Sequence, residues 1–71
     1  MFSLAEENYL KAIYHLESKH NGAIPTNAIA EAMNTKPSSV TDMVQKLAEK
    51  EVLSYVKYKG NSLTKKGKKI M

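Results

Sequence analysis

The chain has 71 residues, 42% of them hydrophobic, with no cysteine and a formal net charge of +4. This length allows one small domain with a thin core, and the lack of cysteine excludes disulfides and cysteine-type zinc sites. No apolar run approaches the ~20 residues of a transmembrane helix, and the N-terminus lacks the pattern of a signal peptide. We therefore expect a cytoplasmic protein.

The charge is distributed unevenly along the chain. Residues 1–51 carry five lysines and all seven acidic residues, whereas residues 52–71 carry six lysines and no acidic residue. This asymmetry favours a polyanionic partner for the C-terminal part, although a solvated lysine-rich segment would give the same pattern. Every basic residue is a lysine, so the bidentate contact between arginine and guanine is excluded.

Residues 4–19 are predicted to form the first helix. Apolar residues recur there at helical spacing, namely Ala5, Tyr9, Ile13 and Leu16. Ser3 and Glu6 have the spacing of a capping box at its start, and Glu6 and Glu7 complement the helix N-terminus electrostatically. Residues 19–22, Lys-His-Asn-Gly, provide a stop signal, and an extended link follows at residues 23–25.

Two further helices are predicted at residues 27–33 and from Pro37 to about Lys50. Thr26 is expected to cap the first of them, and Pro37 suits the first turn of the other. The later helix has two different sides. Its apolar side consists of Val40, Met43, Val44 and Leu47, and its polar side of Ser38, Ser39, Asp42, Gln45 and Lys46. The short connection between the helices is typical of a helix-turn-helix.

After Glu51 the residue pattern changes from helical to strand-like. Residues 53–58 are predicted to form a strand, residues 59–61 (Lys-Gly-Asn) a turn, and residues 62–63 a brief return strand. Thr64 is expected to cap a final helix over residues 65–71. The predicted fold is a mainly α (α+β) winged helix-turn-helix, with three helices, a two-stranded wing and a short C-terminal helix in one domain, residues 1–71.

Four segments carry a family resemblance: ENYLKAIYHLE, TNAIAEAM, PSSVTDMVQKL and YVKYKGNSLTKKGKKI. With them, nearly the whole chain resembles the N-terminal DNA-binding domain of the iron- and manganese-dependent repressors, the diphtheria toxin repressor-like family. The resemblance implies a homodimeric repressor, activated by divalent iron or manganese, that binds palindromic operators in double-stranded DNA. In that family the dimerisation helices and most metal ligands follow the wing. We therefore expect this chain to be a fragment that is monomeric and has no cofactor.

The helix-turn-helix supplies most of the candidate DNA-binding residues. They are Thr26, Lys36, Pro37, Ser38, Ser39, Thr41, Asp42, Gln45 and Lys46. Short hydroxyl side chains can approach bases or phosphates closely, and Gln45 and Lys46 reach further. Serines after a proline are also common helix caps, so capping is the alternative role for Ser38 and Ser39. The Asp42 carboxylate would either accept from a cytosine amino group or face solvent.

The predicted wing supplies the remaining candidates. Lys57 and Lys59, beside the flexible Gly60, would place ammonium groups on phosphates, and Tyr58 could pack or donate its hydroxyl to a phosphate. The alternative is an edge hairpin that lysines protect from pairing with other chains.

The resemblance also implies one metal ligand in the first helix, directly before Tyr9, at Asn8. Manganese-selective relatives carry an aspartate there and a glutamate three residues later, where this chain has Lys11. An amide oxygen is a weak ligand and an ammonium group repels cations, so we expect no specific metal site in this chain. His15 and His20 are expected to be surface residues.

Catalysis has no support in the sequence, because cysteine, a glycine-rich phosphate loop, HExxH and a nucleophile elbow are all missing. Two alternatives to operator binding stay open at this point. One is a winged helix that binds a protein through its third helix, and the other is an RNA-binding module that uses the lysine-rich segment.

Overall fold

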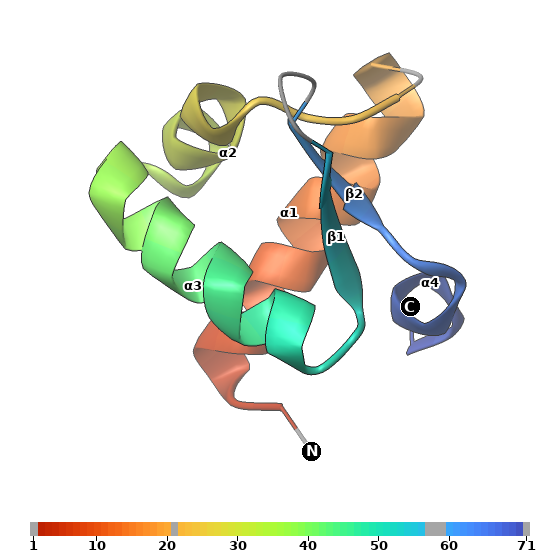
Figure 1. The fold of residues 1–71 in the computed structure, drawn as a ribbon. Helices are drawn as coiled ribbons and strands as arrows, with labels where there is room; N and C mark the ends of the chain where they lie inside the picture. The colour runs from red at the N-terminus through yellow and green to blue at the C-terminus, as the bar shows by residue number, and fades with distance from the viewer. Residues whose placement is uncertain (1, 21, 57–59, 71) are drawn as a thin grey trace.

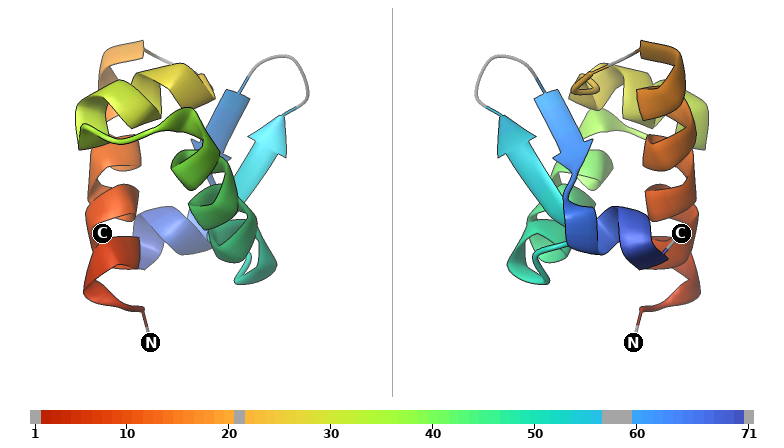
Figure 2. Two further views of the ribbon diagram at one scale, coloured as in Figure 1. Left: turned by 90° about the vertical axis from the view of Figure 1, so that its left-hand side faces the viewer. Right: turned by 90° about the vertical axis from the view of Figure 1, so that its right-hand side faces the viewer.

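The computed structural model describes residues 2–20, 22–56 and 60–70, and it has the predicted element order (Figure 1). The elements are α1 (Leu4–His20), α2 (Thr26–Met33), α3 (Pro37–Glu49), β1 (Leu53–Val56), β2 (Gly60–Leu63) and α4 (Lys65–Ile70). The three longer helices pack together, the hairpin lies against α3 and α1, and α4 follows β2 (Figure 2). The predicted winged helix is confirmed. None of the described helices is long and apolar enough to span a membrane.

Two predicted helix caps are confirmed. At the start of α1 the Ser3 N–H donates to Glu6 Oε1 at 2.9 Å, and the Glu6 N–H donates to Ser3 Oγ at 3.2 Å. These reciprocal bonds are those of a capping box. At the start of α4 the Gly67 N–H donates to Thr64 Oγ1 at 3.1 Å, while the same hydroxyl donates to the Glu51 carbonyl at 2.7 Å.

The predicted capping role of Thr26 is wrong. Helix α2 begins at Thr26 itself, and Pro25 is the N-cap residue, without a side-chain hydrogen bond. The proline ring holds φ at −62° in extended backbone, and the Pro25 carbonyl accepts from the N–H groups of Ala28 and Ile29 at 3.0 and 3.3 Å. The Thr26 hydroxyl instead lies 3.4 Å from Nδ2 of Asn61, which donates to it.

The hairpin begins its return strand earlier than predicted. β1 and β2 are antiparallel, with Leu53 opposite Leu63 and Tyr55 opposite Asn61. Gly60 and Asn61, predicted in the turn, belong to β2, where they pair with Val56 and Tyr55 of β1. Asn61 also pairs with Ile24 through two backbone hydrogen bonds of 2.7 Å. Lys57, Tyr58 and Lys59 lie outside the described residues.

Gly60 is a position that only glycine fits. Its φ is 124°, a conformation that residues with a Cβ rarely adopt, and a Cβ there would collide with the Ile24 carbonyl oxygen. The close approach of β2 to the link before α2 therefore depends on this glycine.

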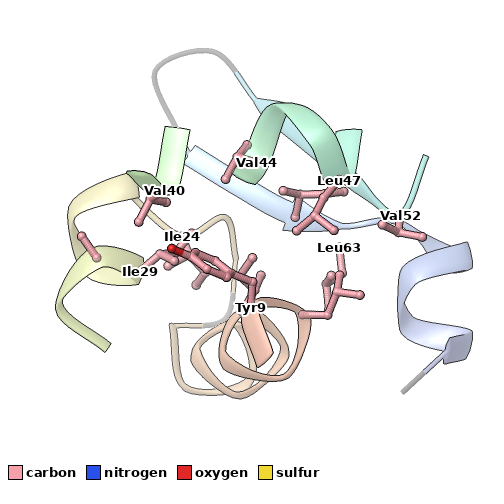
Figure 3. Packing of buried hydrophobic residues seen from close by; sticks show 12 residues of the cluster. Tyr9, Ile24, Ile29, Val40, Val44, Leu47, Val52 and Leu63 are labelled. Atoms are coloured by element: carbon pink, nitrogen blue, oxygen red, sulfur yellow. The ribbon is translucent and has the colours of Figure 1, made fainter. Parts of the chain in front are cut away.

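One core joins all the elements before α4 (Figure 3). Its buried side chains are Tyr9, Leu10, Ile13, Ile24, Ile29, Ala30, Val40, Val44, Leu47, Val52, Leu53 and Leu63. In α3 the buried residues are the predicted Val40, Val44 and Leu47. Of the apolar residues at helical spacing in α1, Ala5 is exposed, and its neighbour Glu6 is buried instead.

Glu6 connects the start of α1 to the end of α3. It is only 7% exposed, and its Oε2 lies 2.7 Å from Nζ of Lys50, which also lies 4.8 Å from the centre of the Phe2 ring. Donation from Lys50 and from the Ser3 N–H lowers the pKa of Glu6 to about 2, against the opposing effect of burial. The prediction that Glu6 serves the helix N-terminus is thus only part of its role.

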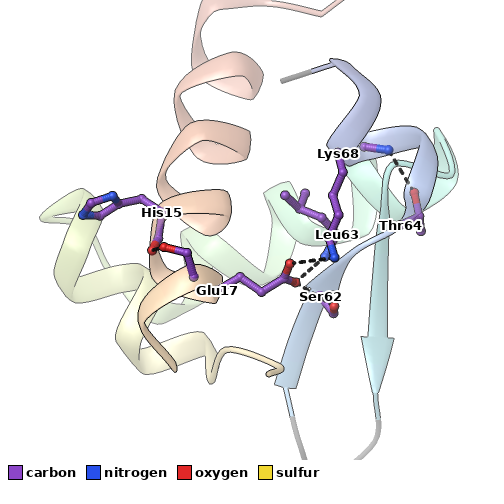
Figure 4. A network of polar contacts seen from close by, with 8 residues as sticks. His15, Glu17, Ser62, Leu63, Thr64 and Lys68 are labelled. Carbon is purple, nitrogen blue, oxygen red and sulfur yellow. Dashed lines mark hydrogen bonds and ion pairs between the residues drawn. The ribbon is translucent and has the colours of Figure 1, made fainter. Parts of the chain in front are cut away.

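Glu17, near the end of α1, forms polar contacts with both β2 and α4 (Figure 4). Its Oε1 accepts from the Ser62 hydroxyl at 2.7 Å and from the Leu63 N–H at 2.9 Å, and Nζ of Lys68 lies 3.5 Å from Oε2. Burial raises the pKa of Glu17, but these donors together outweigh it and leave the pKa below its ordinary value of 4.5. The hairpin is therefore held against the helices by polar as well as apolar contacts.

Replacing Leu47 by alanine tests the packing of α3. Leu47 is fully buried, so Leu47→Ala should lower the free energy of unfolding by about 2–5 kcal/mol, much of the stability of so small a domain. Leu4→Ala is the matched control, because Leu4 is 74% exposed and should change stability by about 0.5 kcal/mol or less. Chemical denaturation of both variants provides the measurement. An unchanged midpoint for Leu47→Ala would show that α3 faces another way.

Because the pKa of Glu6 is lowered on folding, we expect the stability difference between the Glu6→Gln variant and the unaltered chain to depend on pH. A carboxylate whose pKa falls from 4.5 to about 2 on folding stabilises the folded state above pH 4.5, and this contribution is lost as the pH falls toward 2. Glu6→Gln should therefore lower the melting temperature at pH 7, and the difference from the unaltered chain should shrink between pH 4.5 and 2. Glu7→Gln removes the same charge from an exposed position in the same turn. If Glu6→Gln lowers the melting temperature by the same amount at every pH, the role given to the Glu6 carboxylate is contradicted.

Candidate nucleic-acid interface

The polar side of α3 is the largest group of predicted DNA-binding residues that the structure brings together. All six of its polar candidates are exposed: Ser38, Ser39, Thr41, Asp42, Gln45 and Lys46. The apolar side of the helix is buried in the core, so its orientation is fixed. Together these residues make a continuous exposed surface along one side of a helix, which is the arrangement that a major groove accepts.

The two serines of α3 are not used as caps. Lys36 is the N-cap residue, with extended backbone, Pro37 is the first helical residue, and no side chain caps the helix. The predicted alternative role of Ser38 and Ser39 as caps is therefore not observed. Their hydroxyls lie at the exposed N-terminal end of α3, next to the exposed Lys36.

The Thr41 hydroxyl has less hydrogen-bonding capacity to offer a ligand than the hydroxyls of Ser38 and Ser39. Its hydroxyl donates to the Pro37 carbonyl at 3.1 Å, within the helix. In this rotamer its oxygen can still accept and its methyl group can contact apolar atoms, but its proton is already used. Thr41 thus suits a thymine methyl group or a base amino group better than a phosphate.

The connection between α2 and α3 sets the position of the N-terminal end of α3. Helix α2 ends at Asn34, which has left-handed backbone with φ 54° and ψ 49°. The next N–H, from Thr35, donates to the Ala30 carbonyl at 2.9 Å, which closes the turn. The two helices are therefore joined by a short connection with fixed hydrogen bonds, as in a helix-turn-helix.

A cavity of about 300 Å³ lies between α3 and the hairpin. It is lined by Thr26, Thr41, Val44, Gln45, Ala48, Tyr55 and Asn61. Thr26, predicted as a DNA-binding residue, lies here rather than on the exposed side of α3. Tyr55 and Asn61 were missed by sequence reasoning. They form a cross-strand pair, and that register could not be read from the sequence once Asn61 was assigned to a turn.

Asn61 joins the hairpin to the start of α2. It is fully buried, and its Nδ2 donates to the Ile24 carbonyl at 3.2 Å and to the Thr26 hydroxyl at 3.4 Å. Its Oδ1 accepts no hydrogen bond from the described residues. These bonds, with the backbone pairing to Ile24, fix the distance between the hairpin and the helix-turn-helix.

The six lysines of residues 52–71 divide into two groups, of which the structure describes only the one in α4. Lys57 and Lys59, with Tyr58, fall outside the described residues, so their predicted contacts with phosphate stay predictions. In α4, Lys66 Nζ lies 4.0 Å from Glu51 and Lys68 Nζ lies 3.5 Å from Glu17. Two of the four α4 lysines therefore have acidic neighbours, which reduces the positive potential available there for a polyanion.

Comparison with known proteins gives one family and several relatives. The family described as "Iron dependent repressor, N-terminal DNA binding domain" matches residues 1–61. The HTH-type transcriptional regulator MntR of Oceanobacillus iheyensis is 55% identical over 65 residues, which are 90% of this chain and 43% of that protein. MntR of Geobacillus thermodenitrificans is 52% identical over 64 residues, 90% of this chain and 45% of that protein. The chain thus spans less than half the length of these two relatives.

The residues of α1 do not fit a metal ion. Asn8, the predicted ligand, is exposed, and so is Lys11 one turn further along. The nearest buried carboxylate, that of Glu6, is already paired with Lys50. Among the described residues no group of three or more histidine, cysteine, aspartate or glutamate side chains could hold a metal, and His15 and His20 are exposed.

Titration with metal checks this assignment. We expect calorimetry with Mn²⁺, Fe²⁺ or Zn²⁺ at micromolar concentration to give no stoichiometric binding to this chain, because one amide oxygen beside an ammonium group is a poor ligand set. One tight site in the titration would contradict this. His15→Ala and Glu7→Gln would then identify the ligands.

Proposed function

Because the chain belongs to the family of iron-dependent repressor N-terminal DNA-binding domains, we propose that it is the operator-reading domain of a metal-dependent transcriptional repressor. The observation that carries this proposal is the exposed polar side of α3, whose opposite side is fixed in the core and whose serines are not used as caps. The proposed activity is reversible occupancy of DNA, without enzymatic chemistry.

In this function α3 enters the major groove and the hairpin contacts the adjacent backbone. Gln45 can bond two positions of adenine, Asp42 can accept from the cytosine amino group, and Thr41 can meet a thymine methyl group. Lys46 lies in the last turn of α3, on its exposed side, and supplies a positive charge for a phosphate. We propose the same role for Lys57 and Lys59 in the wing. The exposed side of α3 would thus discriminate between bases, while the lysines hold the domain on DNA.

We further propose that the whole protein is a homodimer that binds a palindromic operator in the cytoplasm. Two-fold symmetric operators match dimers that place one reading helix on each half-site. The two relatives are more than twice as long as the matched part, so we assign dimerisation and the response to iron or manganese to the length that this chain does not cover. The poor fit of Asn8 and Lys11 to a metal ion supports this assignment.

Substitutions in α3 and in the wing should have different effects on DNA binding. The chain, fused to a dimerising coiled coil, would first select its preferred duplex from a random pool. Gln45→Ala should then reduce the preference for this duplex over a scrambled one, because a base contact is lost. Lys59→Ala should weaken binding to both duplexes equally and reduce the salt slope by about one phosphate contact.

Lys69→Ala in α4 is the matched control for the lysine change, and it should have little effect. If Lys69→Ala weakens binding as much as Lys59→Ala, the lysine-rich segment carries the affinity and an RNA-type mode becomes the better explanation. If Lys59→Ala changes sequence preference and Gln45→Ala does not, the wing reads the bases and the roles are reversed. Failure to bind any duplex even at low salt would favour the alternative of a protein partner.

A further inference from the structure

We propose that the cavity between α3 and β1 receives the sugar–phosphate backbone of one DNA strand, and that the Tyr55 hydroxyl donates a hydrogen bond to a phosphate there. This inference rests on the proposed function and adds to it a contact surface and a residue outside the helix-turn-helix and the tip of the wing.

The first support is position. Thr41 and Gln45 line the cavity and also belong to the exposed side of α3. The lining also includes Tyr55 of β1 and Asn61 of β2. Of these two strands, β1 lies next to α3 (Figures 1 and 2). When a helix lies in the major groove and a hairpin contacts the neighbouring backbone, one strand must pass between them. The cavity occupies that position.

The second support is the chemistry of the lining. None of its seven residues carries a charge, so no carboxylate within it repels a phosphate. Val44 and Ala48 give the cavity an apolar part of its lining, which suits the carbon atoms of deoxyribose. Tyr55 and Thr26 add polar groups to the lining, and neutral hydroxyl donors such as tyrosine are frequent partners of phosphate oxygens.

The third support is the exposure of Tyr55 itself. Its side chain is 60% exposed, although a tyrosine in a strand of so small a domain would add stability if it were buried. Tyr55 stands directly opposite Asn61, which is fixed by its bonds to Ile24 and Thr26. The backbone at Tyr55 is thus held in place by the strand pairing, so the position from which the side chain extends is set before a ligand arrives.

The test is binding of the 71-residue chain to its selected duplex, measured by fluorescence anisotropy at low and moderate salt. Tyr55→Phe keeps the ring and removes only the hydroxyl, so we expect binding to the selected and the scrambled duplex to weaken by about tenfold, with an unchanged salt slope. Tyr14→Phe is the matched control. Tyr14 is 49% exposed on α1, where it lines a different concavity with Glu17 and Lys68, and its change should leave binding within about twofold.

A second pair of variants tests the cavity without Tyr55. Ala48→Glu places a carboxylate in the lining and should abolish duplex binding, whereas Ala48→Gln has nearly the same size without the charge and should retain more affinity. Thermal melting of each variant separates loss of binding from loss of folding.

The outcomes separate this inference from the proposed function. If Gln45→Ala weakens binding but Tyr55→Phe and Ala48→Glu do not, the cavity takes no backbone, while operator reading by α3 stands. If neither the unaltered chain nor its dimeric coiled-coil fusion binds any duplex at low salt, both proposals fail. If Tyr55→Phe weakens binding to single-stranded RNA and not to duplex DNA, the cavity serves a different nucleic acid and the inference is wrong.

Discussion

The burial of Val40, Val44 and Leu47 is the contact on which the rest of the structure depends. In a chain of 71 residues there is one core, and these three side chains bring α3 into it against α1, α2 and the hairpin. Since they recur at helical spacing on one side, the opposite side of α3 must face solvent. The exposure of Ser38, Ser39, Asp42 and Gln45 is thus a consequence of the core and not a separate feature.

Polar contacts fix the relative positions of helices and hairpin that the thin core alone does not determine. The ion pair between Glu6 and Lys50 attaches the end of α3 to the start of α1. At the other side, the pairing of Asn61 with Ile24 fixes the hairpin relative to the link before α2, and Gly60 allows the close approach. The cavity beside α3 exists because both neighbours of the helix are held in this way. A surface that must meet a stiff ligand such as duplex DNA gains affinity from this preorganisation.

The sequence was sufficient to predict the element order and the exposed side of α3, because periodicity and caps are local properties. Ser3 with Glu6, Thr64 and Pro37 each act within one turn of their own helix, and each lies where the pattern placed it. The errors at Gly60 and Asn61 have one common cause. Asn61 pairs with Ile24, 37 residues away, and nothing in the local pattern reports such a contact.

The burial of Glu6 and the lining of the cavity also depend on contacts between distant residues, which the local sequence pattern does not report. The carboxylate of Glu6 is buried only because Lys50 arrives from the end of α3, so its burial is invisible along α1 alone. The cavity combines residues of two helices and two strands, and Tyr55 gains its place in it from the strand register. The exposed side of α3 could be predicted from one segment, whereas the residues that the hairpin adds to the cavity required the fold.

The central claim is that the exposed side of α3 is the surface that contacts DNA. Mapping of amide chemical shifts in the labelled chain, as its selected duplex is added, tests this most directly. The account predicts that the largest changes fall on residues 36–46 and on the hairpin around Tyr55, with small changes at the exposed residues Lys11 and Tyr14 of α1. Changes concentrated on α1 or on α4, with α3 unaffected, would contradict it.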